Sequence, residues 1–237
     1  MTASARARHV LPLVLLAIVL LPACATQPKN IFLNDAERAA LRKQPAIHVV
    51  HYTTPLPEVR PPTVSRHYAK VKLHDTPTGA EIQSNLGNFD PTLEVTQRFV
   101  GILSKRAGLA NLRTEREAAP LPVLKDFDQF KGKYKDGVVL EVWIPRWGFH
   151  FTPIDWKTYS ITLSAQARMS RVENGKLIWT VGKCGYGGSG NTYDDRIVLT
   201  DLKTSESKKV QAKIKQTVAR IAEACASQLM QDFSRDK

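Results

Sequence analysis

The 237-residue sequence contains only three cysteines, no acidic residue before Asp35 and no apolar run long enough to cross a bilayer. A membrane-spanning helix needs about 20 apolar residues, so a polytopic membrane protein is excluded. The glycines and prolines follow no period, which excludes a collagen-like repeat. The sequence contains no internal repeat of about 20 to 50 residues, so neither a solenoid nor a propeller is expected. The hydrophobic fraction of 43% and charged fraction of 24% are typical of a globular protein.

Residues 1–23 have the pattern of a cleaved export signal. Arg6 and Arg8 form a basic start, and residues 10–21 are non-polar but too short to span a bilayer. The tetrapeptide Leu21–Cys24, Leu-Pro-Ala-Cys, follows directly and resembles the lipobox of bacterial lipoproteins. The resemblance implies cleavage just before Cys24, a diacylglycerol on the Cys24 thiol and an acyl chain on the new amino group.

The position after Cys24 is alanine, so the aspartate that retains lipoproteins at the inner membrane is absent. The resemblance therefore implies an anchor in outer-membrane lipid, on the periplasmic face. Removing residues 1–23, which include two basic side chains, leaves 214 residues with a net charge of +10. Because the periplasm holds little nucleic acid, this charge favours anionic lipid headgroups, peptidoglycan or an acidic envelope protein as the partner, and no nucleic acid.

Acylation of Cys24 leaves two thiols, Cys184 and Cys225. An even pair in an oxidising compartment predicts a disulfide. The bridge would join the C-terminal helix to the end of a strand. By the chain-entropy model it would stabilise the fold by about 3–4 kcal/mol.

Eight prolines from Cys24 to Pro91, Pro91 included, predict that residues 24–90 form a lipid-anchored tether. Within the tether, Asn34 and Glu37 have the spacing of a capping box, which predicts a short helix over 34–43. Residues 47–52 are a possible first strand. Residues 91–237, together with 47–52, are predicted to form a single periplasmic domain.

The periodicity of the domain predicts an α+β (mixed α/β) fold, with helices packed on a mixed, largely antiparallel sheet. The last element is a long helix over 205–233, because apolar residues recur there at three- and four-residue steps. The other expected elements are a helix from Asp90 to Gly108, strands at 109–114, 138–151, 159–169 and 176–183, and a short helix at 123–131. Pro145 indicates a sheet edge or a β-bulge, and Asn174-Gly175 indicates a hairpin turn.

This order of elements resembles the periplasmic α/β domain shared by the curli secretion channel lipoprotein, the lipoprotein activator of penicillin-binding protein and the N-terminal domain of the Tol-system β-propeller protein. The resemblance covers residues 47–233 and adds to the lipobox at Leu21–Cys24. It implies no catalytic residues. The segments with which the secretion channel inserts into the membrane have no counterpart here, so a pore is not expected.

An aromatic row follows one strand parity through Trp143, Trp147, Phe149 and Phe151. Two interpretations stay open. The row packs into the core, as aromatic rows usually do, or it forms a partner-binding strip, with Arg146 as a polar handle on the opposite parity. The basic positions of the long helix have two interpretations as well, a solvated face or a contact with anionic headgroups or the cell wall.

Three motifs with possible chemistry are weak. Residues 185–190 match G-x-G-x-x-G, but no helix begins directly after them, so we expect a loop and no cofactor. His48 and His51 point to opposite faces of a strand and are expected to be exposed, which predicts no metal site. Neither a nucleophile elbow nor an H-E-x-x-H motif is present.

The sequence thus predicts a non-catalytic binding, assembly or accessory factor for an envelope or secretion complex. Two alternatives remain. One is an envelope enzyme acting on peptidoglycan or lipid, with Glu141 and Asp155 as an acid pair. The other is a carrier of a hydrophobic ligand in a pocket bounded by Trp143 and Trp147.

Overall fold

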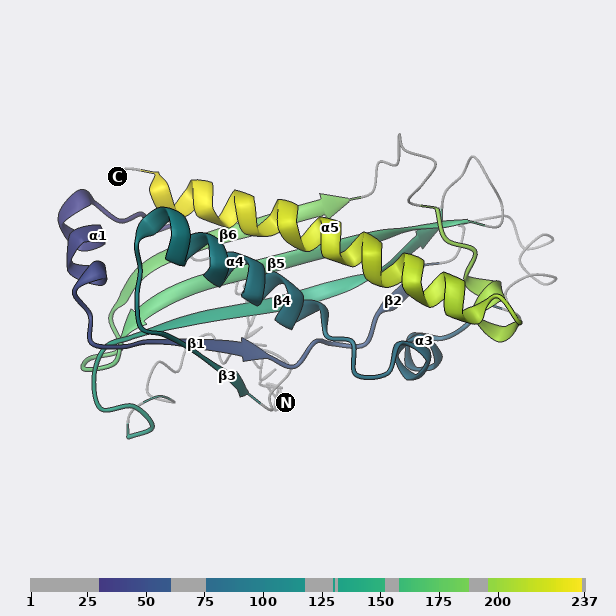
Figure 1. Cartoon of the computed structure of the whole chain (residues 1–237), viewed down its shortest axis with the longest axis horizontal. Coiled ribbons are helices and arrows are strands. Elements are labelled where there is room, and N and C mark those ends of the chain that lie inside the picture. Colours follow the sequence, from purple (N-terminus) through teal and green to yellow (C-terminus); the bar gives the residue numbers. More distant parts are fainter. Residues whose placement is uncertain are drawn as a thin grey trace, which may run out of the picture.

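The computed structural model describes residues 30–60, 76–117, 130, 132–151, 158–187 and 196–235. Their centre is a mixed sheet with two long helices lying across one face (Figure 1). The strands are β1 (Ile47–Tyr52), β2 (Glu58–Arg60), β3 (Leu112–Glu117), β4 (Val138–Phe151), β5 (Tyr159–Arg171) and β6 (Leu177–Gly187). The helices are α1 (Asp35–Arg42), α3 (Gly79–Leu86), α4 (Pro91–Ile102), η1 (Leu103–Ala107), η4 (Leu199–Lys203) and α5 (Ser207–Ser234).

The sheet has the strand order β3-β1-β4-β5-β6, and β2 pairs with β4 beyond the end of β1. Strand β1 runs parallel to β3 and β4, and β2 also runs parallel to β4. Strands β4, β5 and β6 are antiparallel to one another. The structure therefore confirms the predicted α+β fold and its long C-terminal helix.

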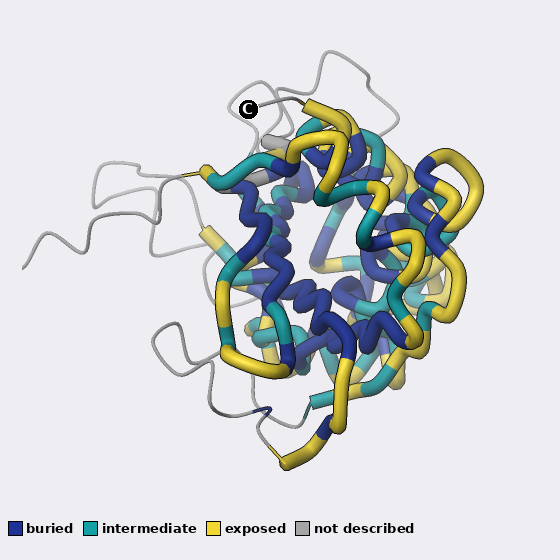
Figure 2. The backbone as a smooth tube through the Cα atoms, turned by 90° about the vertical axis from the view of Figure 1, so that its left-hand side faces the viewer, coloured by how far each residue is buried: buried dark blue, intermediate teal, exposed yellow. Residues whose placement is uncertain are grey.

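Helix α5 buries the apolar stripe that its sequence predicts, and α4 lies beside it. These two helices and the sheet enclose the main core. Seen end-on, the buried segments lie toward the middle of the molecule and the exposed ones mostly at the rim (Figure 2). The stripe residues of α5 are all buried: Val210, Ile214, Val218, Ile221, Cys225, Leu229 and Phe233.

Residues 30–46, 53–60 and 76–90 belong to the folded body together with 47–52, whereas a tether over 24–90 with only 47–52 in the domain was predicted. Ile31 pairs with Thr180 of β6 through two backbone hydrogen bonds of 3.1 and 3.0 Å. Leu33 and Leu41 are buried in the main core. Prolines did not prevent this, and two of them, Pro55 and Pro57, occupy the connection between β1 and β2, where no ladder donor is required. Residues 24–29 and 61–75 lie outside the described residues.

Side-chain caps fix the starts of three helices. The predicted capping box of α1 is present, with reciprocal 2.8 Å hydrogen bonds between Asn34 and Glu37. Asp90 caps α4 by accepting from the Thr92 and Leu93 amides at 3.0 and 3.2 Å. Helix α3 begins at a second capping box, formed by Thr78 and Glu81. Their T-x-x-E spacing indicates such a helix start, but this helix was not predicted.

Other elements agree with the sequence to within a few residues. Gly108, with φ of +65°, ends η1 after α4. The hairpin between β5 and β6 turns at Gly175, also at φ of +65°. Apart from Phe130, the helix expected over 123–131 lies outside the described residues. No helix of the described part is long and apolar enough to cross a membrane.

Candidate functional site

A β-bulge in β4 divides the aromatic row between the two faces of the sheet. Trp143 pairs with Gln166 and Arg146 pairs with Ser164, so three steps along β4 match two along β5. The extra residue falls at Pro145, which cannot donate to the ladder. Side-chain parity therefore reverses after the bulge. Trp143 lies on the face away from the helices, and the expectation that the whole row shares one face is wrong.

Trp147 and Phe149 lie in the main core beneath the helices, with 1% and 0% of their surface exposed. The Trp147 indole Nε1 donates to the Pro55 carbonyl at 2.8 Å and so ties β4 to the connection between β1 and β2. Gly148 allows β2 to lie close to β4, because a Cβ there would stand 2.0 Å from the Glu58 carbonyl oxygen.

An exposed aromatic partner-binding strip is therefore not supported for Trp143, Trp147 and Phe149, whose side chains are buried. Phe151 is half-buried at the end of the strand and meets Tyr159 edge-on at 6.1 Å. Arg146, expected as the polar handle, is exposed. Trp147 and Phe149 fill space in the main core, and Trp143 does so in a smaller hydrophobic cluster on the other face of the sheet. These positions agree with the interpretation that the aromatic row packs into the interior.

The face of the sheet away from the helices carries a buried ion pair. Glu141 and Arg168 are directly opposed on β4 and β5, with 0% and 3% of their surfaces exposed. The Arg168 guanidinium donates from Nε and Nη2 to both Glu141 oxygens, the second bond at 2.8 Å. The Tyr52 hydroxyl donates to Glu141 Oε1 at 2.5 Å. Arg168 also lies 5.7 Å from the centre of the Trp143 ring.

This network links three adjacent strands, β1, β4 and β5, and fixes their register. Apolar and polar residues alternate from Tyr159 to Met169, and this alternation predicts a solvent-facing Arg168, so the pairing of Arg168 with Glu141 was not predicted. No periodicity signals a buried arginine, because an arginine on a polar strand face usually points to water. Asp155, the suggested acid partner of Glu141, lies outside the described residues.

The two histidines of β1 are buried, which corrects the expectation that they are exposed. His48 stacks on Tyr134 with ring centres 3.9 Å apart, and its Nδ1 lies 3.7 Å from Glu115. Tyr134 donates to the same Glu115 at 2.9 Å. Burial and this carboxylate raise the pKa of Tyr134. Among the described residues, no group of three or more metal-ligating side chains comes together.

His51 lies on the opposite face of β1 from His48 and is 6% exposed. Burial lowers the pKa of His51, while the nearby Asp90 carboxylate opposes that shift and Arg116 adds to it. Histidine burial was not predictable from the spacing alone. It follows from the packing of both faces of β1 against other residues, since all six residues of the strand are buried and they contribute to a hydrophobic cluster on each face.

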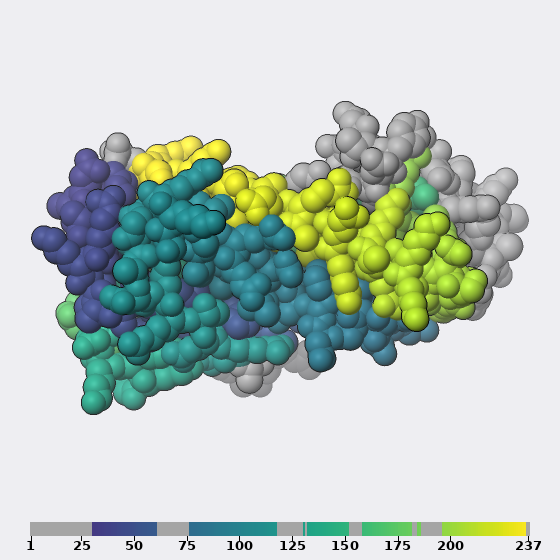
Figure 3. Space-filling model, viewed as in Figure 1, coloured from purple at the N-terminus to yellow at the C-terminus, as the bar shows by residue number. Residues whose placement is uncertain are grey.

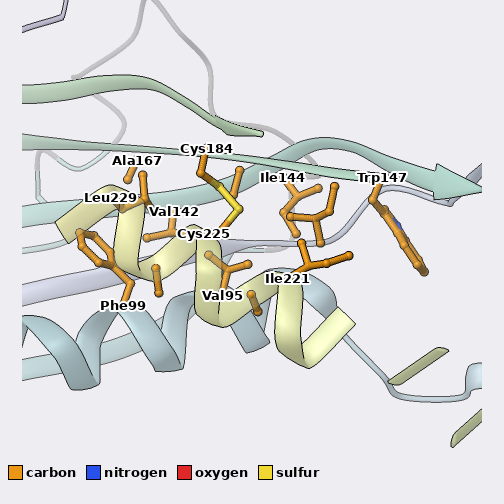
Figure 4. Close-up of a cluster of buried hydrophobic side chains, with 14 of the residues drawn as sticks. Val95, Phe99, Val142, Ile144, Trp147, Ala167, Cys184, Ile221, Cys225 and Leu229 are labelled. Atoms are coloured by element: carbon orange, nitrogen blue, oxygen red, sulfur yellow. A yellow bond between two sulfur atoms is a disulfide. The ribbon is translucent and has the colours of Figure 1, made fainter. Parts of the chain in front are cut away.

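Cys184 and Cys225 form the predicted disulfide (Figure 4). It joins β6 to α5 with their Cα atoms 5.1 Å apart and lies inside the main core. Leu229 and Val142 lie near it in the same cluster (Figure 4). The bridge therefore fastens the long helix to the antiparallel half of the sheet.

The outer face of α5 carries a hollow of about 460 Å³. Its lining among the described residues is Lys209, Ala212, Lys213, Gln216 and Arg220. These positions recur at three- and four-residue steps, so they form one stripe along the helix. They include three of the five basic residues of α5, namely Lys209, Lys213 and Arg220. The stripe carries only positive charge.

No protein-family model matches this chain, and no curated protein matches it. Solved structures of partial similarity include the hypothetical protein CT253 from Chlamydia trachomatis, at 9% identity and a TM-score of 0.33, over 81% of this chain and 100% of that one. Protein XCC0632 from Xanthomonas campestris has 10% identity and a TM-score of 0.35, over 85% and 91% of the two chains.

Lipoprotein GNA1162 from Neisseria meningitidis is 21% identical with a TM-score of 0.27, over 75% of this chain and 99% of that one. TM-scores below 0.5 do not establish a shared fold, so these structures do not indicate the function of this chain. The resemblance to the periplasmic α/β domain of the curli channel lipoprotein and its relatives stays a prediction.

Proposed function

We propose that this protein is a lipoprotein of the bacterial outer membrane, anchored on the periplasmic face through acyl chains on Cys24. In that position it acts as a non-catalytic binding, assembly or accessory factor for an envelope or secretion complex. The observation that carries the proposal is the tetrapeptide Leu21–Cys24, placed directly behind a basic start and a short apolar run. Three acyl chains exceed what stable membrane anchoring requires.

Two features of the folded body support this proposal. The Cys184–Cys225 disulfide suits an oxidising compartment, in which such bridges persist. The Glu141 carboxylate is engaged by Arg168 and Tyr52 and lies beneath the surface. It is therefore an ion-pair partner that stabilises the sheet, which favours a binding role over acid catalysis by that residue.

Fractionation and crosslinking of the full-length chain in a Gram-negative host test the proposal. We expect the wild-type chain in the outer-membrane fraction, crosslinked to a discrete envelope protein, and the Cys24→Ala variant lost from that fraction. Ser84→Ala, at an exposed position in α3, is the matched control and is expected to behave like the wild type. Equal recovery of the wild type and Cys24→Ala in the outer membrane would contradict the anchor. Turnover of peptidoglycan or lipid by the purified wild type would contradict the non-catalytic role.

A further inference from the structure

The charges of α5 are arranged against its own dipole. Residues 207–220 contain five basic side chains and no acidic one, whereas residues 221–234 contain Glu223 and Asp232 and no basic one. A helix is stabilised by acidic side chains in its first turn and basic ones in its last. Lys208 and Lys209 occupy the first turn of α5, and Asp232 occupies the last. Helix stability therefore does not account for this arrangement.

Few carboxylates lie at ion-pair distance from the lysines in the basic half of α5. Lys209 reaches Glu206 at 3.5 Å, but its side chain is 85% exposed. Lys215 lies over the Phe89 ring at 5.8 Å, a contact that keeps its charge. Within the described part of the chain, Lys208 and Lys213 have no carboxylate at ion-pair distance. The part of the hollow that Lys209 and Lys213 line is therefore a positive surface that keeps most of its charge.

The composition of this surface distinguishes between kinds of partner. Protein interfaces depend on buried aromatic, aliphatic or arginine anchors. The basic stripe offers only Ala212 as an apolar contact, and the one large exposed hydrophobic residue of the described part, Leu56, lies in the connection between β1 and β2. Four of the five cations in this half of α5 are lysines, which bind anions as point charges and lack the directional fork that arginine presents to carboxylates and phosphates. These features favour an extended anionic surface, such as lipid headgroups, over a single bound ligand or a protein interface.

The position of the anchor brings such a surface within reach. Asn30 is the sixth residue after Cys24, so the body lies within about 20 Å of the acylated cysteine. Ile31 and Phe32 lie at the C-terminal end of α5, where Arg235 covers the Phe32 ring at 5.5 Å. The rise of about 1.5 Å per residue places Arg220 about 20 Å and Lys209 about 36 Å from Phe233 along α5, and these are the two ends of the basic stripe. Helix α1 and the basic half of α5 are visible on the same face of the molecule (Figure 3).

We infer that the first half of α5 docks on the phosphate headgroups of an anionic membrane, so that the anchored protein lies with α5 along the bilayer. The inference rests on the proposed lipid anchor, which holds one end of the helix at the membrane. The basic stripe then holds the other end. Docking of this kind weakens with salt, because the screening length falls from about 10 Å at 0.1 M to about 3 Å at 1 M.

Chemical labelling of lysine amines tests this orientation in the full-length lipidated protein. The protein is reconstituted in vesicles of phosphatidylcholine, with or without phosphatidylglycerol, and the labelling of each lysine is measured by mass spectrometry. We expect Lys209 and Lys213 to react roughly fivefold more slowly on the anionic vesicles at low salt, and equally fast at high salt. Lys135 and Lys176, which are both exposed, are the internal controls. Lys176 lies four residues before Thr180, the residue of β6 that pairs with Ile31.

A charge variant and its matched control sharpen the test. In Lys209→Gln/Lys213→Gln/Arg220→Gln, Lys215 is expected to react at the same rate on both kinds of vesicle. In Lys135→Gln/Lys176→Gln/Arg113→Gln, which removes three exposed charges elsewhere, Lys215 stays protected on anionic vesicles. Equal labelling of Lys209 and Lys213 on both vesicles in the wild type would overturn the inference. Stronger protection by isolated peptidoglycan than by anionic vesicles would overturn it in favour of the cell wall.

Anchoring and docking fail in distinguishable ways. Loss of the protein from vesicles at high salt contradicts the lipid anchor. In that case, flotation of the protein with phosphatidylglycerol vesicles at low salt tests the docking separately. Binding to these vesicles supports the inference, and absence of binding contradicts it.

Discussion

Trp147 combines two contacts that belong to the interior of the protein. Its ring fills the main core beneath the helices, and its Nε1 bonds to the Pro55 carbonyl. Trp147→Ala removes both, and large-to-small changes of a buried tryptophan typically cost about 3–5 kcal/mol. We expect a loss of that size in the free energy of unfolding, measured with urea on the oxidised chain.

Trp147→Phe keeps most of the ring and is expected to cost less than Trp147→Ala. Arg146→Ala, at the exposed neighbouring position, serves as the control and should change the free energy by no more than about 0.5 kcal/mol. If Trp147→Ala unfolds at the same urea concentration as the wild type, the tryptophan is not part of the core.

His51 is expected to make the free energy of unfolding depend on pH. Burial lowers the pKa of His51 below its ordinary value of 6.5, so the folded chain binds this proton less readily than the unfolded chain. The contribution of His51 to stability is therefore complete above pH 6.5 and is lost as the pH falls below it. We expect the free energy of unfolding to fall between pH 7.5 and pH 5.5, and to fall less in His51→Gln.

His150 is the comparison for this measurement. Its pKa is also lowered, by burial and by Arg60, but it is only half-buried at the end of β4. His150→Gln is expected to retain a larger part of the pH dependence than His51→Gln. Parallel pH profiles of wild type and His51→Gln would contradict the assignment.

At the scale of elements, the disulfide links α5 to β6 and closes a loop with a sequence separation of 41 residues. A loop of that length restricts the unfolded chain by about 4 kcal/mol in the chain-entropy model. We expect Cys184→Ala/Cys225→Ala to lower the free energy of unfolding by about 3–4 kcal/mol. Reductant should destabilise the wild type similarly and leave the double variant unchanged. A wild type insensitive to reductant after full reduction would contradict this role.

Elements with a strong period were predictable from the sequence. The stripe from Val210 to Phe233 predicted α5, and the alternation from Tyr159 to Met169 predicted β5. The bulge at Pro145 was also indicated, but its consequence was not, because one extra residue reverses the parity of everything beyond it. Pairing across strands is not visible in a single sequence either, so the opposition of Glu141 and Arg168 was missed.

At the scale of the whole molecule, the boundary between tether and body was the largest error. Proline content indicated a spacer over 24–90, yet Ile31, Leu33 and Leu41 contribute to the sheet or the core. Prolines restrict the backbone without preventing burial, and the partner strand of Ile31 lies about 150 residues further along the chain. The tether that remains between Cys24 and Asn30 is short, which is why the proposed anchor constrains how the body approaches the membrane.

The central claim is that Cys24 becomes the acylated N-terminus of the mature protein. The most direct test is the intact mass of the protein purified from a Gram-negative membrane, with fragmentation of its N-terminal peptide. We expect loss of residues 1–23 and three acyl chains with their glycerol on Cys24. We also expect Cys24→Ala to retain the signal and carry no acyl chain. A mature N-terminus at any other residue, or an unmodified Cys24, would contradict it.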